Sequence, residues 1–163
     1  MKTSPVGLVF IEKNEGLKLT VYSDNGRPAI GYGHDLTEAE IATGKYAKGI
    51  TTLDAQMLLE ADVDKVEAAL NPLIPASCTQ NQWDALVDFG YNLGVGSLKT
   101  MLGHGWAQVP QQIPRWHHKK VDGVEQEDPR LKARRMAEVA LFEGSSQQTV
   151  LSSQSQSPEF ADN

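Results

Sequence analysis

The hydrophobic and polar positions of the chain predict mostly helix, with one short stretch of strands near the start. Apolar residues recur at helical spacing from position 5 to about Asn14, and over the longest distance from Leu53 to Leu70, where acids lie opposite the apolar positions. The expected apolar face of this longest helix consists of Met57, Leu58, Ala61, Val66 and Leu70. A helix of this length is suited to connect two lobes of one fold.

Capping side chains mark where the helices begin. Two caps stand before a proline at the first helical position, and three others have capping-box spacing. They are Ser4 with Pro5, Asp128 with Pro129, Thr37 with Glu40, Thr51 with Asp54, and Thr79 with Gln82. Between the last two helical segments the sequence predicts short helices over 97–104 and 107–113 and then a charged loop up to Glu127.

Residues 93–96, which include two glycines, are expected to close the helix that begins after Thr79 and to make a tight corner. In that helix, Trp83 and its apolar neighbours are expected to pack inward. Trp116 is assigned to the core as well. From Gly144 onward half of the residues are Ser or Gln, which predicts a disordered tail over 144–163.

The strand pattern lies in the segment from Glu15 to His34. Leu17, Leu19 and Val21 alternate with polar residues, as in a half-buried strand, and Asp24 opens a turn signal before a second short strand. This layout can bring the carboxyl groups of Glu15 and Asp24 face to face. At the end of a helix and near apolar neighbours, Glu15 is expected to have a raised pKa, whereas Asp24 in a polar turn stays ionised.

Composition and charge narrow the function. With 163 residues, 40% of them hydrophobic, the chain has the size of one domain with a real core. A net charge of −6 argues against nucleic acid as a partner. No export signal or membrane span is recognisable, so no stable membrane association is expected. Cys78 is the only cysteine and has no base beside it in sequence, which favours a structural thiol.

No cofactor or metal is expected from the motifs. The sequence has no glycine-rich phosphate loop and no His/Cys set with zinc spacing. His117 and His118 are adjacent and are expected to point in different directions, which favours solvated loop histidines over a shared metal site.

Several motifs together resemble the phage-type lysozymes, the muramidase endolysins of glycoside hydrolase family 24. The resemblance covers about residues 5–143. It is carried by Glu15-Gly16-Leu17, Tyr22, Asp24, the run Ile30-Gly31-Tyr32-Gly33-His34, the segment from Gln82-Trp83-Asp84-Ala85-Leu86 to Asn92, Pro114-Arg115-Trp116, and Leu131, Arg134, Arg135, Glu138 and Phe142.

This resemblance implies an α+β, predominantly α, lysozyme-like fold with a small β-sheet in the N-terminal lobe and a long connecting helix. One catalytic domain is expected over 1–143, with the N-terminal lobe at about 12–60 and the C-terminal lobe at about 72–143 plus the first helix. The substrate implied is the glycan of peptidoglycan, bound between the lobes. Glu15 matches the general acid, and Asp24 matches the aspartate that assists water attack.

The same resemblance suggests further residues of the site. An arginine at the position of Arg134 or Arg135 is expected to approach Glu15 across the cleft, and this pairing would lower the Glu15 pKa against the effect of burial. The candidates to bind substrate are Tyr32, His34, Asn92, Arg134 and Arg135; for the first three, core packing or capping is an equally open alternative.

One position departs from the family pattern. The residue before the run 30–34 is usually threonine, whose hydroxyl is thought to hold the attacking water, and here it is Ala29. The leading hypothesis is a muramidase that cleaves the β-1,4 bond between N-acetylmuramic acid and N-acetylglucosamine, with weak to moderate activity. Two alternatives stay open: a catalytically impaired wall-binding module, and a lytic transglycosylase, which needs only the acid.

The implied setting is that of an endolysin. A monomer made in the cytoplasm of a bacterial host without a signal peptide would reach the cell wall after release through a separate pore.

Overall fold

The structure, a computed structural model, describes residues 1–24, 26–121 and 123–144. Its order is α1 (Pro5–Glu15), β1 (Lys18–Asp24), β2 (Arg27–Gly31), β3 (His34–Asp35), α2 (Glu38–Thr43), α3 (Thr52–Leu70), η1 (Asn71–Leu73), α4 (Gln80–Leu102), η2 (Trp106–Gln108), α5 (Val109–Gln112), η3 (Ile113–Arg115), β4 (His118–Val121), β5 (Val124–Glu127) and α6 (Pro129–Phe142). This is the expected α+β fold, predominantly α. Of the predicted disordered tail over 144–163, the described residues include only Gly144. The rest of that prediction lies outside them.

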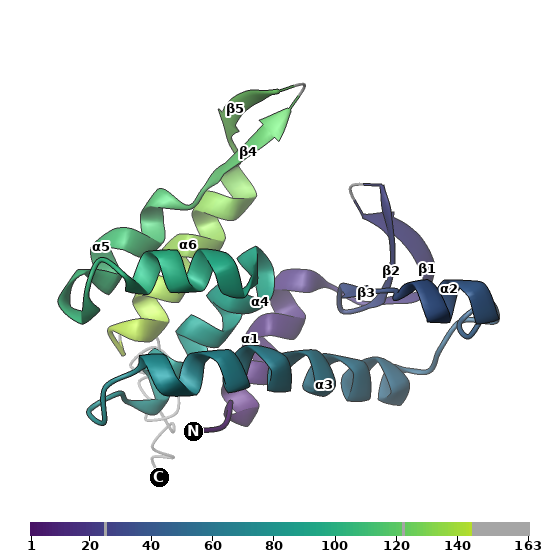
Figure 1. Cartoon of the computed structure of the whole chain (residues 1–163), viewed down its shortest axis with the longest axis horizontal. Helices are drawn as coiled ribbons and strands as arrows, with labels where there is room; N and C mark the ends of the chain where they lie inside the picture. The colour runs from purple at the N-terminus through teal and green to yellow at the C-terminus, as the bar shows by residue number, and fades with distance from the viewer. Residues whose placement is uncertain (25, 122, 145–163) are drawn as a thin grey trace, which may run out of the picture.

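Helix α3 spans the molecule (Figure 1). The antiparallel sheet β1–β2–β3 and α2 lie near its first residues, and α4, α5 and α6 gather beside its second half. The β1–β2 and β4–β5 hairpins project in the same general direction from the two sides. None of the helices in the described ranges is long and apolar enough to cross a membrane.

The caps predicted from sequence are present. Ser4 accepts a hydrogen bond from the Gly7 amide, and Asp128 accepts from Arg130 and Leu131. The three other caps form complete capping boxes, at Thr37, Thr51 and Thr79. Each cap satisfies amides that have no partner inside the helix. Because a cap depends only on residues close in sequence, these helix starts were predicted correctly.

The predicted apolar face of α3 is partly wrong. Val66 and Leu70 are buried, but Met57 is 62% exposed and Ala61 is also exposed. The other buried apolar side chains of α3 are Ala55, Leu59 and Val63. Apolar residues occur around most of this helix, so periodicity alone could not predict which face is buried against the core.

Helix α4 is the centre of the core, and it is kinked. Trp83, Leu86 and Phe89 are fully buried, and Trp116 packs edge-on against Phe89 with ring centroids 5.7 Å apart. Gly94 has φ 82° and ψ 157°, which no helix interior adopts, so the helix turns there as the glycines of 93–96 predicted. The short helix expected over 97–104 is the second half of α4.

Two predictions about strands were wrong. The expected loop before Glu127 contains the hairpin β4–β5, in which Val121 pairs with Val124. All of its strand residues are exposed, so no alternation of burial marks them. In β1, Leu19 and Val21 are 40% and 42% exposed instead of half-buried, because the hairpin extends away from the body (Figure 1).

Candidate active site

A cavity of about 390 Å³ lies where the end of α1, the three-stranded sheet and the kink of α4 meet. It is lined by Glu15, Asp24, Arg27, Gly33, Asp35, Tyr91, Asn92, Leu93 and Gly94. The two carboxylates that the sequence singled out therefore face one cavity. Asn92, a predicted substrate-binding residue, lines it too.

Glu15 ends α1 and is largely buried, with 18% of its side chain exposed. Its Oε1 lies 2.7 Å from Nη1 of Arg134, which comes from α6. Burial raises the pKa of Glu15 above the ordinary value, and the Asp88 and Asp24 carboxylates raise it further, whereas the Arg134 charge lowers it. The net direction is upward, so this carboxyl holds its proton to higher pH than an ordinary glutamic acid.

Arg134 is held by a second, buried carboxylate. Its Nε and Nη2 donate to the two oxygens of Asp88, on α4, at 2.9 and 2.8 Å. This fork is the strongest geometry available to an arginine–carboxylate pair, and Asp88 is fully buried. Asp88 therefore aims the remaining nitrogen of Arg134 at Glu15.

The second arginine faces away from Glu15. Arg135 is fully buried, donates to Oδ1 of Asn92 at 2.9 Å and to Oε1 of Glu138 at 2.5 Å, and lies over the ring of Phe89. Burial and the neighbouring Asp88 raise the pKa of Glu138 well above its usual range. Of the two arginines, Arg134 is thus the one that reaches the cavity carboxylate, and Arg135 positions Asn92 from behind.

Gly33 lies against the Glu15 carboxyl group. A Cβ at this position would lie 3.3 Å from Oε2 of Glu15, and the residue has φ 87°, which side chains disfavour. Glycine is therefore needed here both for the turn between β2 and β3 and for the space that Glu15 occupies.

Ala29 is fully buried and is not among the residues that line the cavity. It lies on β2 directly opposite Tyr22 of β1 and Asp35 of β3. Opposed residues of antiparallel strands share a face, and Asp35 lines the cavity, so position 29 is on the cavity side of the sheet. Burial raises the pKa of the Tyr22 hydroxyl, with further contributions from the carboxylates of Asp24, Glu15 and Asp35.

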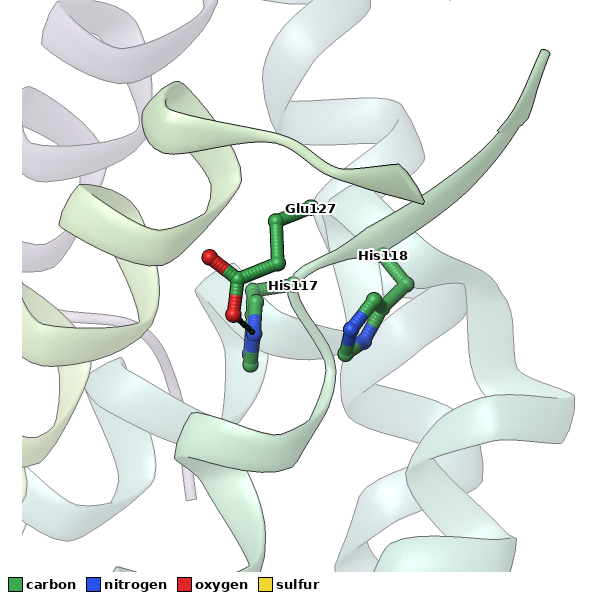
Figure 2. Close-up of side chains that lie close together, drawn as sticks. All are labelled: His117, His118 and Glu127. Atoms are coloured by element: carbon green, nitrogen blue, oxygen red, sulfur yellow. Dashed lines mark hydrogen bonds and ion pairs between the residues drawn. The ribbon is translucent and has the colours of Figure 1, made fainter. Parts of the chain in front are cut away.

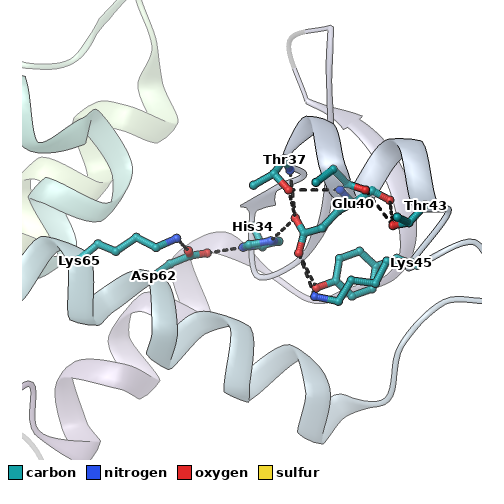
Figure 3. A network of polar contacts seen from close by, with 9 residues as sticks. His34, Thr37, Glu40, Thr43, Lys45, Asp62 and Lys65 are labelled. Atoms are coloured by element: carbon teal, nitrogen blue, oxygen red, sulfur yellow. Dashed lines mark hydrogen bonds and ion pairs between the residues drawn. The ribbon is translucent and has the colours of Figure 1, made fainter.

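Two predicted substrate-binding residues lie elsewhere. Tyr32 is 8% exposed within the core, and its carbonyl accepts a hydrogen bond from Tyr91 at 2.8 Å. His34, also 8% exposed, lies between Asp62 on α3 and Glu40 on α2, with nitrogen–oxygen distances of 2.6 and 3.4 Å (Figure 3). Neither lines the cavity, because each side chain packs or pairs within the fold. This agrees with the structural alternative that the sequence left open.

Several residues of the site were not predicted from the sequence. Arg27, Asp35 and Tyr91 line the cavity, and Asp88 holds Arg134. A usable signal existed for Asp88, since an acid within the apolar run 83–90 is rarely buried without a charged partner. No comparable signal marks Arg27 or Asp35, which reach the site through strand pairing.

Comparison with known proteins places the chain in a family. The family profile described as phage lysozyme matches residues 12–138. An endolysin of Acyrthosiphon pisum secondary endosymbiont phage 1 is 34% identical over 88% of this chain and 99% of its own length. The chain spans 47% of another relative, the endolysin of Bacillus phage PZA, which is 37% identical over 72% of this chain.

Two solved structures are similar. The endolysin from Escherichia coli O157:H7 phage FAHEc1 has a TM-score of 0.73 and 31% identity, covering 89% of this chain and 95% of its own. The muramidase domain of SpmX from Asticaccaulis excentricus has a TM-score of 0.70 and 30% identity, covering 86% and 97%. The chain therefore belongs to the phage lysozyme family and is a glycoside hydrolase.

Proposed function

We propose that the protein is an endolysin-type lysozyme that hydrolyses the β-1,4 bond between N-acetylmuramic acid and N-acetylglucosamine in bacterial peptidoglycan. Glu15 acts as the general acid, and Asp24 activates the attacking water or stabilises the developing positive charge. The observation that carries this proposal is one cavity lined by both carboxylates, with Glu15 buried and its pKa raised. Glycoside hydrolysis needs such a pair, one protonated and one ionised.

The proposed roles follow from the surroundings of each group. Glu15 gives its proton to the oxygen of the leaving sugar, and Arg134 then stabilises the carboxylate that remains, through the 2.7 Å contact. Asn92, fixed by Arg135, presents its amide to the glycan from the α4 side. Arg27 and Asp35 offer charges to substrate from the sheet.

Water positioning is assigned to neighbours of Ala29. A methyl group cannot hold water, but Tyr22 and Asp35, which carry a hydroxyl and a carboxylate, pair with Ala29 from the strands on either side of it. We propose that one of them assists Asp24 in the role that the family pattern gives to threonine. With such a replacement we expect a hydrolase of reduced rate instead of an impaired wall-binding module.

Exchange of Glu15 for glutamine tests the function. In Glu15→Gln, lysis of purified peptidoglycan should fall by at least about a hundredfold, since a general acid contributes 10²–10⁴-fold, while sedimentation with the wall stays unchanged. Glu12→Gln makes the same chemical change one turn earlier in α1 and should lyse normally. Unchanged lysis by Glu15→Gln would refute the assignment.

Two further measurements separate the alternatives. Mass spectrometry of released muropeptides should find reducing ends with a full water, whereas products lighter by one water would identify a lytic transglycosylase. For position 29, Ala29→Thr should lyse faster than wild type, and Ala29→Val, which has the same shape without the hydroxyl, should not. Equal rates for wild type and Ala29→Thr would show that this position is not limiting.

The remaining proposals concern organisation and setting. We propose one catalytic domain over 1–143 whose two lobes, at about 12–60 and about 72–143 plus α1, enclose the cavity. The protein acts as a monomer on the cell wall of a bacterial host, reaching it from the cytoplasm through a separate pore. The endolysins among its relatives support this setting.

A further inference from the structure

His117, His118 and Glu127 meet at the base of the β4–β5 hairpin, outside the cavity described above (Figure 2). His118 is the first residue of β4 and pairs directly with Glu127, the last residue of β5. His117 precedes the strand, and its carbonyl accepts a hydrogen bond from the Asp128 amide at 2.8 Å. The three side chains are thus brought together by the closure of the hairpin.

The two histidines do not diverge as their adjacency predicted. Their ring centroids are 4.2 Å apart and the rings are tilted by 33°. The rule that neighbouring side chains alternate holds only within a strand, and His117 precedes β4, which begins at His118. One potential ligand atom from each of His117, His118 and Glu127 lies within 4.8 Å of the others.

The hydrogen bonds of His117 leave one nitrogen as an acceptor. Nδ1 lies 2.5 Å from the carbonyl oxygen of Pro114, which can only accept, so Nδ1 carries the proton. In the neutral ring Nε2 then has a lone pair, and it faces Oε1 of Glu127 at 3.1 Å. Nε2 is therefore the nitrogen of His117 that can bind a metal ion beside the Glu127 carboxylate. A backbone carbonyl that fixes the tautomer is also the usual outer support of a metal-binding histidine.

The donor set and its spacing suit a particular class of ion. A tetrahedral ion with bonds of about 2.0–2.1 Å places its ligand atoms about 3.3 Å apart, close to the separation of His117 Nε2 and Glu127 Oε1. The His118 ligand atom lies within 4.8 Å of the other two. Because His118 is exposed, rotation of its side chain can bring this atom to the distance that the ion requires. Lys132 contacts the other oxygen of Glu127 at 3.4 Å, which leaves Oε1 available. Two imidazoles and one carboxylate favour Zn²⁺ over Mg²⁺ or Ca²⁺.

We propose that His117, His118 and Glu127 form a binding site for a divalent transition-metal ion of the zinc class. The ion joins the start of β4 to the end of β5 and, through Pro114, to η3. Three protein ligands leave a fourth position for water.

Zn²⁺ titration of the full chain, without a histidine tag, tests the site. Isothermal titration calorimetry should find one ion bound per chain, and Mg²⁺ should not compete. His118→Ala and Glu127→Gln should each weaken Zn²⁺ binding by at least about tenfold, because loss of even an outer-shell partner of a metal ligand costs about 10–100-fold. With Co²⁺ as the probe, the wild type should show the intense visible absorption of a tetrahedral ion, and both variants should lose it.

Matched controls make the result specific. His104→Ala removes an exposed histidine elsewhere, and Glu125→Gln removes another exposed carboxylate of β5. Both should bind Zn²⁺ as the wild type does. Absence of binding at millimolar Zn²⁺, or equal affinity in His118→Ala and the wild type, would overturn the proposal and leave only the contact between His117 and Glu127 at this place. Circular dichroism should show each variant folded, since the exchanged side chains are exposed.

Discussion

The two carboxylates of the cavity are held in opposite ways. Glu15 is at the end of a packed helix, largely buried, and contacts an arginine that a third carboxylate, Asp88, fixes in the interior. Asp24 ends the exposed strand β1, opposite Arg27 in a hairpin that extends from the body. One acid is anchored by helices from both ends of the chain, and the other by a two-stranded ribbon.

The difference suits the two proposed tasks. A proton donor needs an environment that keeps it protonated, which burial supplies, and the buried arginine limits how far its pKa rises. A group that works with water needs solvent access and adjustable placement, which a projecting hairpin supplies. We therefore expect substitutions around Glu15 to lower the free energy of unfolding, whereas substitutions around Asp24 should affect mainly activity.

The largest effect is expected at Arg134. Arg134→Met leaves Asp88 buried without its partner, and the free energy of unfolding should fall by about 3–5 kcal/mol. Arg27→Met removes an arginine from the hairpin side, where the 3.3 Å pair with Asp35 is exposed, and should cost less than about 1 kcal/mol. Urea unfolding measures both. Equal losses of unfolding free energy in the two variants would contradict the difference between the surroundings of Glu15 and Asp24.

Two glycine substitutions separate an effect on stability from an effect on the active site. Gly33→Ala and Gly26→Ala both place a side chain at positive φ, 87° and 85°, and should each cost about 1–2 kcal/mol by thermal unfolding. Only at position 33 does the new Cβ press on the Glu15 carboxyl group, since nothing lies within 4 Å of it at position 26. Lysis should therefore drop further in Gly33→Ala. The same activity in both variants would contradict the close packing of Gly33 on Glu15.

The pH dependence follows from the raised pKa of Glu15. Only the protonated carboxyl can donate, so lysis should decline as pH rises through this pKa, which lies above the ordinary 4.5. The Asp24 charge contributes to the increase, so Asp24→Asn should move the Glu15 titration, followed by ¹³C NMR, to lower pH. Asp64→Asn, on the surface of α3, should leave it in place. An upward movement in Asp24→Asn would mean that the two groups do not interact as their shared cavity requires.

The smallest effect is expected at His34, which joins the sheet to α3. Hydrogen bonds to Asp62 and Glu40 raise its pKa above 6.5, so the folded state binds the proton more tightly than the unfolded state. This contribution is full below pH 6.5 and is lost as pH rises through the raised pKa. The melting temperature of His34→Gln should therefore differ most from the wild type at low pH. A difference that grows toward alkaline pH would contradict this sign.

The sequence predicted local features better than distant ones. Caps such as Thr51 and the break at Gly94 depend on a few neighbouring residues, so they were found. Motif and spacing predicted that Glu15 and Asp24 face each other, and both line one cavity, whereas their catalytic roles stay a proposal. Which face of α3 is buried depends on the elements that pack against it, and periodicity does not record them. The hairpin β4–β5 is exposed throughout, so no alternation of buried residues marks its strands. Asp88 and Asp35 join the site only through tertiary contacts and strand register.

The contact between Glu15 and Arg134 also joins two helices that are far apart in the sequence. Glu15 belongs to the first helix and Arg134 to the last, so the pair cannot form until α6 has been synthesised and has docked on α4. A ribosome-bound chain that still lacks α6 would carry both cavity carboxylates without the arginine that tunes the acid. A chain that ends before α6 therefore lacks the arginine that contacts Glu15, and we expect it to be inert toward the wall.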